Sequence, residues 1–104
     1  MAGRNLIIVE NVNTPGRTAH VNAEKYSAMR EALLKALPAR RPGLTQQAMI
    51  GAVLPFLPEA LWPAGAKAAW WVKTVQLDLE AKGLVLRETI DRRAHWRRAA
   101  PPAR

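Results

Sequence analysis

The chain has 104 residues, 49% of them hydrophobic, which allows one globular domain with a modest core and excludes wholesale disorder. It contains no cysteine, which excludes disulfides, thiolate metal sites and cysteine nucleophiles. Sixteen lysines and arginines against eight acidic residues leave a net charge of +8, and such a surface attracts polyanions, above all nucleic acid.

The first segment predicts a β-hairpin. The aliphatic run Leu6–Val9, extended by Val12, is typical of a strand, and Thr18–Val21 is the expected returning strand. The Asn-Thr-Pro-Gly sequence at 13–16 forms the turn, because Pro presets its own φ and Gly supplies the positive φ that follows. A hairpin alone is marginal in water, so we expect residues 1–21 to lie on the helices, join another sheet or pair with a second copy.

Three helices are predicted between residues 22 and 82. The first begins with Asn22 as N-cap, and Glu24 lies in its first turn, where the helix dipole favours an anion. Its apolar residues recur at helical spacing and define a buried stripe of Tyr26, Met29, Leu33 and Leu37. Residues 38–43 end this helix and form a basic connector.

The second helix begins at Thr45, a favourable N-cap, and kinks or ends near Pro55, which cannot donate a backbone hydrogen bond. Its expected apolar side consists of Met49, Ile50, Val53 and Leu54. The segment 56–63 is then a loop or one short helical turn. Three of its side chains are expected to fill the core, namely Leu57, Leu61 and Trp62.

The third helix is predicted from about residue 66 to 82, with Gly83 as its C-cap. At about 100° per residue its core face gathers Ala68, Trp71, Val72, Val75 and Leu79. Trp70 and Leu77 lie on the opposite side. Either the N-terminal hairpin covers them, which is the interpretation we favour, or they form an interface with a second copy or a partner protein.

A second hairpin is predicted over residues 84–98, with a charged tip at 89–93, and residues 99–104 form a disordered tail. Residues 1–98 thus make a single domain. Period-two alternation points Leu84, Leu86 and Trp96 inward. The same alternation points outward the side chains of Val85, Arg87, His95 and Arg97.

This order of elements predicts a mainly α protein with small β elements: a winged helix-turn-helix, with a three-helix bundle and a C-terminal wing, preceded by a short β-hairpin. Residues 70–85 resemble the passage from third helix to wing in bacterial winged-helix modules, among them the N-terminal domains of Mrr-type restriction proteins. Residues 10–17, 43–45 and 70–83 are more similar to a family of small uncharacterised bacterial proteins, over nearly the whole chain. That resemblance implies a compact fold and no assigned activity.

No recognisable catalytic apparatus is present in the sequence. His20 and His95 fall in separate predicted hairpins and outside any metal-binding motif, and the sole serine, Ser27, lies inside a predicted helix. Asp78 and Glu80 are two residues apart on a helix, so they point to different sides and make a poor acid–base pair. We therefore expect neither enzymatic activity nor a metal or cofactor.

The winged-helix interpretation predicts DNA binding, with a regulatory role as one option. The third helix would enter the major groove and offer Lys67, Lys73, Thr74 and Gln76. The connector and the wing would meet phosphates or a minor groove through Arg40, Arg41, Arg87, Arg92, Arg93 and Arg97. The alternative is a protein–protein or homodimerisation module that uses the Trp70/Leu77 face and binds no DNA.

Charge and hydropathy also set the expected surroundings of the protein. Residues 87–104 hold six arginines and two acidic residues, so this end supplies +4 of the net charge; a simpler interpretation is that it keeps a small protein in solution. The longest aliphatic run, Leu6–Val9, is too short for a membrane span or a signal-peptide core. We expect a cytoplasmic protein without a membrane partner, and the composition fits a bacterial genome rich in G and C.

Overall fold

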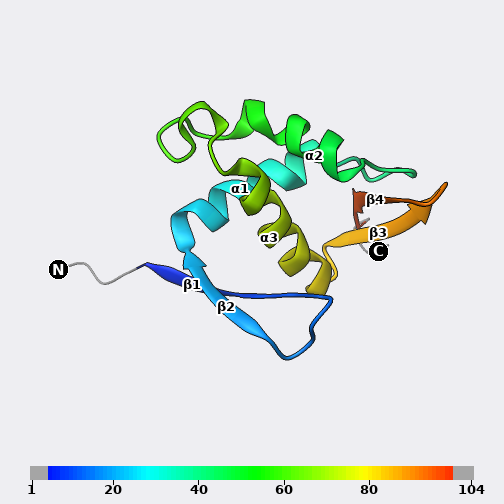
Figure 1. Ribbon diagram of the computed structural model, residues 1–104, viewed down its shortest axis with the longest axis horizontal. Coiled ribbons are helices and arrows are strands. Elements are labelled where there is room, and N and C mark those ends of the chain that lie inside the picture. Colours follow the sequence, from blue (N-terminus) through cyan, green and yellow to red (C-terminus); the bar gives the residue numbers. More distant parts are fainter. Residues whose placement is uncertain (1–4, 100–104) are drawn as a thin grey trace, which may run out of the picture.

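The computed structural model describes residues 5–99, which form two β-hairpins and three helices (Figure 1). The elements follow in the order β1 (Leu6–Glu10), β2 (Thr18–Asn22), α1 (Ala23–Ala36), α2 (Gln46–Val53), α3 (Ala68–Ala81), β3 (Val85–Ile90) and β4 (Arg93–Arg98). Two 3-10 turns, η1 (Leu54–Phe56) and η2 (Pro63–Gly65), lie between α2 and α3. Each hairpin is a separate two-stranded antiparallel sheet. The predicted tail lies outside the described residues except for Ala99.

The first two helices begin at the predicted caps. The side-chain oxygen of Asn22 accepts from the Lys25 amide at 2.8 Å, and the Thr45 hydroxyl accepts from the Ala48 amide at 3.3 Å. As predicted, the regular helix α2 ends before Pro55, and the 3-10 turn η1 follows it directly. The reason is that Pro55 has no backbone N–H to donate. Local chemistry therefore accounts for these helix boundaries.

Gly83 ends α3, as the sequence predicts. Its φ of 76° is in the left-handed region that favours glycine. The Gly83 amide donates to the Glu80 carbonyl at 3.1 Å, and the Leu84 amide donates to the Leu79 carbonyl at 2.9 Å. This hydrogen-bond pattern is a Schellman motif, and it turns the chain sharply from α3 into β3.

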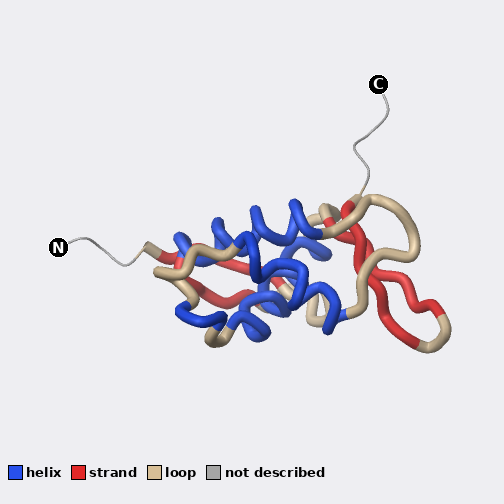
Figure 2. Tube along the Cα trace, turned by 90° about the horizontal axis from the view of Figure 1, so that it is seen from above, coloured by secondary structure: helices blue, strands red, loops and turns tan. Residues whose placement is uncertain are grey.

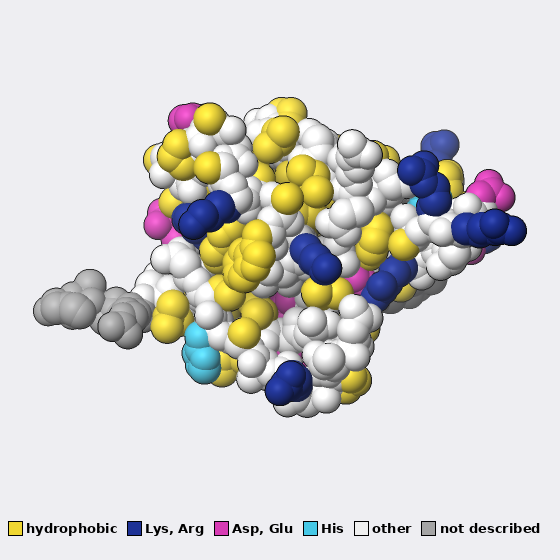
Figure 3. Space-filling model, viewed as in Figure 1, with side chains coloured by type: hydrophobic (Ala, Val, Ile, Leu, Met, Phe, Trp, Pro, Cys, Tyr) yellow, Lys and Arg dark blue, Asp and Glu magenta, His cyan; other side chains and the backbone are white. Residues whose placement is uncertain are grey.

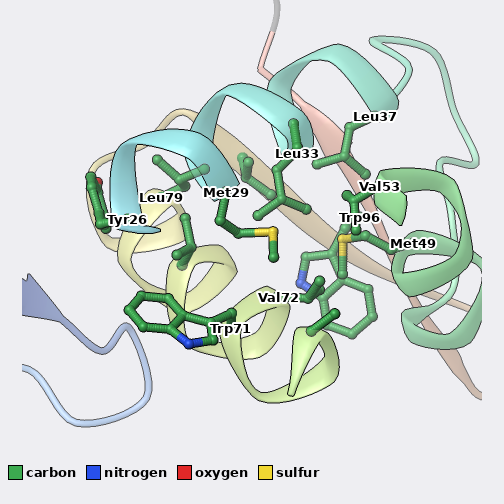
Figure 4. Packing of buried hydrophobic residues seen from close by; sticks show 14 of the residues in the cluster. Tyr26, Met29, Leu33, Leu37, Met49, Val53, Trp71, Val72, Leu79 and Trp96 are labelled. Atoms are coloured by element: carbon green, nitrogen blue, oxygen red, sulfur yellow. The ribbon is translucent and has the colours of Figure 1, made fainter. Parts of the chain in front are cut away.

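The core lies between the three helices (Figure 4). The apolar stripe predicted on α1 and the core face predicted on α3 are both buried. Trp62 closes the core from the loop before η2, with only 1% of its surface exposed. Burying each large apolar side chain contributes about 1.5–3 kcal/mol, so this cluster is the main source of stability.

The N-terminal hairpin packs on α1 and α3, which is one of the three placements expected for it (Figure 1). Val9 and Val21 face the helices and are buried. Leu6 and Ile8 alternate with these positions and are 47% and 53% exposed. The hairpin therefore has one covered face and one face with aliphatic side chains in solvent.

The C-terminal hairpin differs from its predicted register. Val85 is buried, whereas Leu84 and Leu86 are 37% and 40% exposed, so the expected orientation of these three residues is wrong. The reason is the Schellman motif, which uses Leu84 to close α3 and makes Val85 the first strand residue to face the core. Trp96 is buried as predicted, and because Arg87 is its cross-strand partner, Arg87 shares the inner face.

The connector between α1 and α2 lies against β4. The backbone groups of Leu44 and Trp96 exchange two hydrogen bonds of 2.8 Å, and the Arg98 amide donates to the Pro38 carbonyl at 2.9 Å. Gly43 makes this approach possible, since a Cβ at its position would lie 2.2 Å from the Trp96 carbonyl oxygen. The basic connector and the C-terminal hairpin thus form one end of the molecule.

Candidate nucleic-acid interface

Asp78 on α3 holds the N-terminal hairpin. Its fully buried carboxylate accepts from the Glu10 amide at 2.9 Å, from the Tyr26 hydroxyl at 2.5 Å and from the Lys82 ammonium. Burial and the adjacent carboxylate raise the pKa of Tyr26, so its hydroxyl stays protonated and acts as a donor. One acidic side chain thereby ties β1, α1 and α3 together.

Glu80 on α3 holds the C-terminal hairpin in the same way. Its carboxylate, with 5% of the side chain exposed, accepts from Trp96 Nε1 at 3.0 Å, Gln76 Nε2 at 2.7 Å and Arg87 Nε at 2.9 Å. Arg87 also donates to Asn13 Oδ1 at 3.0 Å and so links the two hairpins. The sequence places these acidic residues on different sides of α3 but does not reveal that both are anchors.

The second half of α3 is mostly buried, which reduces the helix surface that the sequence predicted to contact DNA bases. Gln76, which the sequence offered as a base-reading residue, is 2% exposed and donates to Glu80, so almost none of its side chain is accessible in this structure. Leu77 is 8% exposed, as expected if the N-terminal hairpin covers it, but Trp70 is 57% exposed and the favoured cover does not extend to it. The sequence carried a signal for this burial, because α3 has apolar residues on all sides, which is typical of a central helix. Charged residues on such a helix need partners.

A shared carboxylate fixes two of the predicted DNA-binding arginines. Glu88 on β3 accepts from Arg41 Nε and from Arg97 Nη1, both at 2.9 Å, and Arg41 Nη2 reaches its second oxygen. The hydrogen bond from Arg41 is the main cause that lowers the pKa of Glu88 below its ordinary value. Arg41 therefore attaches the connector to the hairpin, whereas Arg97 joins β4 to β3 within the hairpin, and the two arginines share the single negative charge of Glu88.

The hairpin tip has two arginines beside one acidic residue, Asp91, and so keeps a positive charge. Arg92 and Arg93 are exposed, and neither takes part in an ion pair within the described part of the chain. Arg92 forms the two-residue turn with Asp91, and both have positive φ, 68° and 50°. Figure 3 shows Lys and Arg side chains gathered at the end of the molecule that carries this hairpin. Arg40 on the adjoining connector is exposed as well.

A small cleft opens between the hairpin and the start of α2. It has a volume of about 330 Å³ and is lined by Thr45, Gln46, Gln47, Arg93, Ala94 and Trp96. The first amides of a helix point out from its N-terminus and carry partial positive charge. The cleft therefore combines one arginine with a helix end that favours anions.

A larger groove of about 500 Å³ lies between the N-terminal hairpin and the exposed part of α3. Its wall on the helix side includes Trp70 and Thr74, and Leu77 forms part of its floor. Lys73 on α3 and Lys67, the N-cap residue of α3, lie three residues to either side of Trp70 in the sequence and are exposed. The predicted site residues are thus divided between two surfaces at the two hairpins.

The described residues contain no group of three or more His, Asp or Glu side chains placed to hold a metal ion. In the same part of the chain no helix is both long and apolar enough to cross a membrane.

No curated protein and no solved structure matches the chain. A family model does match, over residues 6–96. This range contains all three helices, the segments that connect them and nearly all of the two hairpins. The match agrees with the predicted resemblance to a family without assigned activity, and it carries no relationship to Mrr-type proteins. The chain belongs to the family of unknown function DUF6958.

Proposed function

We propose that the chain is a small winged-helix protein that binds duplex DNA through its C-terminal hairpin, the wing. One observation carries this proposal: the wing is tied to the body at its root, while Arg92 and Arg93 at its tip are exposed and unpaired in the described part of the chain. A rigid ribbon with a basic tip suits contact with phosphates or with a minor groove.

The order of elements supports the winged-helix assignment. Three helices are followed directly by the hairpin, and Leu44, between α1 and α2, pairs with Trp96 on β4. This pairing gives the wing a single residue of a third strand. Figure 2 shows the hairpin extending past the helices, where a nucleic acid could approach it.

The wing turn presents its arginine at some cost in backbone energy. A two-residue turn with both φ angles positive favours Asn-Gly or Asp-Gly, and here Arg92 stands at the glycine position. An L-residue in this region costs of order 1 kcal/mol. Backbone strain often occurs at functional positions, and here it falls on an exposed residue that has no ion-pair partner in the described part of the chain, which supports a role for Arg92 in binding.

The cleft beside Arg93 supplies a second contact. A backbone phosphate in this cleft would meet the Arg93 guanidinium and the N-terminus of α2, a combination that favours anions. Of the polar residues predicted to contact DNA from this helix, only Lys67 at its N-cap, Lys73 and the half-buried Thr74 remain, because Gln76 is enclosed. We therefore expect binding that depends on phosphate contacts more than on base sequence.

Labelled random-sequence duplex DNA, titrated at about 50 and about 200 mM salt, tests the proposal. We expect binding that weakens steeply with salt, and Arg92→Ala with Arg93→Ala should lower the salt slope by about two contacts. A charge-matched control, Lys25→Gln with Lys35→Gln on α1, should keep most of the slope. Absence of binding at low salt, or equal losses in both variants, would contradict the proposal.

The second candidate is a protein–protein or homodimer interface, and the exposure of Trp70 favours it. The covered Leu77 can no longer contribute to such an interface. A dimer that sediments as such and dissociates on Trp70→Ala, together with no DNA binding, would support this candidate. In either case we propose a binding protein of the cytoplasm, without cofactor or catalytic role.

A further inference from the structure

We propose that the groove between the N-terminal hairpin and α3 binds an unpaired nucleotide of a single-stranded nucleic acid, with the base stacked on Trp70. This site lies at the other hairpin and goes beyond duplex binding by the wing. The groove is lined by residues of β1, β2, their turn and α3, and its volume of about 500 Å³ is in the range of sites for small ligands.

Trp70 offers an immobilised aromatic surface to solvent. It is 57% exposed, whereas the other three tryptophans, at 62, 71 and 96, are 1%, 7% and 6% exposed. The Trp70 ring meets the buried Trp71 ring edge-on, with centroids 5.2 Å apart and planes at 80°. Because Trp71 is fixed in the core, Trp70 is held in place before any ligand binds, and a base can stack on it at little entropic cost.

Positive charge surrounds this aromatic side chain. Lys73 lies three residues after Trp70 on α3, on a neighbouring position of the helix surface, and Lys67 is the N-cap residue of α3, three residues before Trp70. Arg17 lines the groove from the hairpin side. No ion pair within residues 5–99 involves any of these three cations. Among the described residues that line the groove, Glu10 alone is acidic.

This combination fits a single strand better than the other possible occupants. Single-stranded nucleic acids are bound by aromatic side chains that stack on bases and by cations that follow the backbone, independently of sequence. In a duplex the faces of the bases are already stacked on each other, so Trp70 could not stack on them. A second copy of the chain would bring Lys67, Lys73 and Arg17 towards identical cations, which disfavours association at this groove.

Intrinsic fluorescence can test the site, because Trp70 is the one exposed tryptophan of the four, all of which lie in the described part of the chain. The probes are oligothymidylate and oligouridylate of about eight nucleotides at low salt, and an abasic strand of the same length. We expect both oligonucleotides to quench the fluorescence and the abasic strand to bind weakly without quenching. Equal quenching by the abasic strand would overturn base stacking.

Variants separate stacking from general attraction. Trp70→Ala should weaken binding of the labelled oligonucleotides roughly 10-fold, and Trp70→Phe should restore most of the affinity, as expected for a stacking platform. Phe56→Ala is the matched control, since Phe56 is an exposed aromatic residue (48%) on η1, outside the groove. If Trp70→Ala binds like wild type, or if Phe56→Ala is equally impaired, the proposal is wrong.

The wing variant distinguishes this site from the proposed function. Arg92→Ala with Arg93→Ala should keep Trp70 quenching by oligothymidylate even where duplex binding is lost. If wild-type protein binds no duplex but is still quenched, the groove site holds and the wing proposal fails. Loss of quenching in the wing variant, or a Trp70-dependent dimer in sedimentation that oligonucleotide does not dissociate, would overturn the groove site.

Discussion

The two hairpins are attached to the same helix by the same chemistry, yet they are presented differently. In the N-terminal hairpin, the backbone amide of Glu10 at the end of β1 donates to Asp78, so the strand lies along α3. In the C-terminal hairpin, the side chains of Trp96 and Arg87 near the base of the strands donate to Glu80, and the tip extends away from the helices. The N-terminal hairpin, bound through its backbone, therefore covers part of α3. The C-terminal hairpin, bound through side chains near the base of its strands, extends away from the helices.

The difference follows from the positions of the two carboxylates. Residues 78 and 80 are separated by about 200° around an α-helix, so one central helix can hold a hairpin on each of two sides. The hydrogen bond between Arg87 and Asn13 is the direct link between these two attachments. Each carboxylate can therefore be changed separately, and its effect should appear first in its own hairpin.

The largest effect is expected from Asp78→Ala. The buried Tyr26 hydroxyl and the partly buried Glu10 amide then lose their acceptor. This loss should lower the free energy of unfolding by about 4 kcal/mol. Urea denaturation measures this loss. Tyr26→Phe removes only one donor, so it should cost about 1 kcal/mol and still fold. A loss below about 1 kcal/mol in Asp78→Ala would show that Asp78 is not the anchor.

Gly43→Ala should be nearly as damaging, by about 3 kcal/mol, because the new methyl group would lie 2.2 Å from the Trp96 carbonyl and φ is +85°. The connector would have to separate from β4. Gly51→Ala is the control: it lies in α2 with open space around its Cβ position, so we expect unchanged or higher stability, by up to about 1 kcal/mol. Thermal unfolding of both variants decides, and similar melting temperatures would refute the close approach.

Glu80→Gln should cost about 2 kcal/mol, since Arg87 loses its charged partner while one oxygen can still accept from Trp96. Amide hydrogen exchange should quicken in β3 and β4 and change little in β1 and β2. Asp78→Asn should show the opposite distribution. Uniform acceleration across both hairpins in either variant would mean that the attachments are not independent.

The smallest effect concerns acid. Because the pKa of Glu88 is lowered in the folded chain, its contribution to stability is complete above the ordinary glutamate pKa, about 4.3, and is lost as pH falls through the lowered value. In Glu88→Gln, the part of the acid-induced destabilisation that Glu88 causes should be absent, and high salt should reduce the difference from wild type. Denaturation series at several acidic pH values measure it. Identical pH profiles would show that Arg41 does not stabilise the charged carboxylate.

Much of the local structure could be predicted from the residues themselves. Asn22, Thr45 and Gly83 mark the helix boundaries through their own hydrogen bonds or φ angles, and the periodicity of α1 and α3 identifies the buried stripes. The register of β3 was wrong because it depends on how Leu84 closes α3, which is decided by two hydrogen bonds across the turn. Alternation along a strand predicts which residues share a face, but the turn decides which of the two faces is buried.

The candidate sites were predicted only in part, for a related reason. Their positive charge and their place in a polar turn indicated Arg92 and Arg93, which are exposed at the tip of the hairpin. Arg87, Arg97 and Gln76 carry the same kind of polar group but meet Glu80 or Glu88. Their partners lie between 4 and 9 residues away, in other turns or strands, so only the packing of the hairpins shows which cations and amides are occupied.

By itself, the sequence determined the order of helices and hairpins, the starts of α1 and α2, the end of α3 and the core stripes of α1 and α3, because these depend on neighbours within a turn or a strand; it also determined the excess of positive charge. The tertiary structure decided that α3 is central, that Asp78 and Glu80 are anchors and that Trp70 is left exposed beside a groove. These features depend on residues that are far apart in the chain, such as Glu10 and Asp78. Their energies arise only once burial has removed water from the carboxylates and left the protein's own donors to replace it.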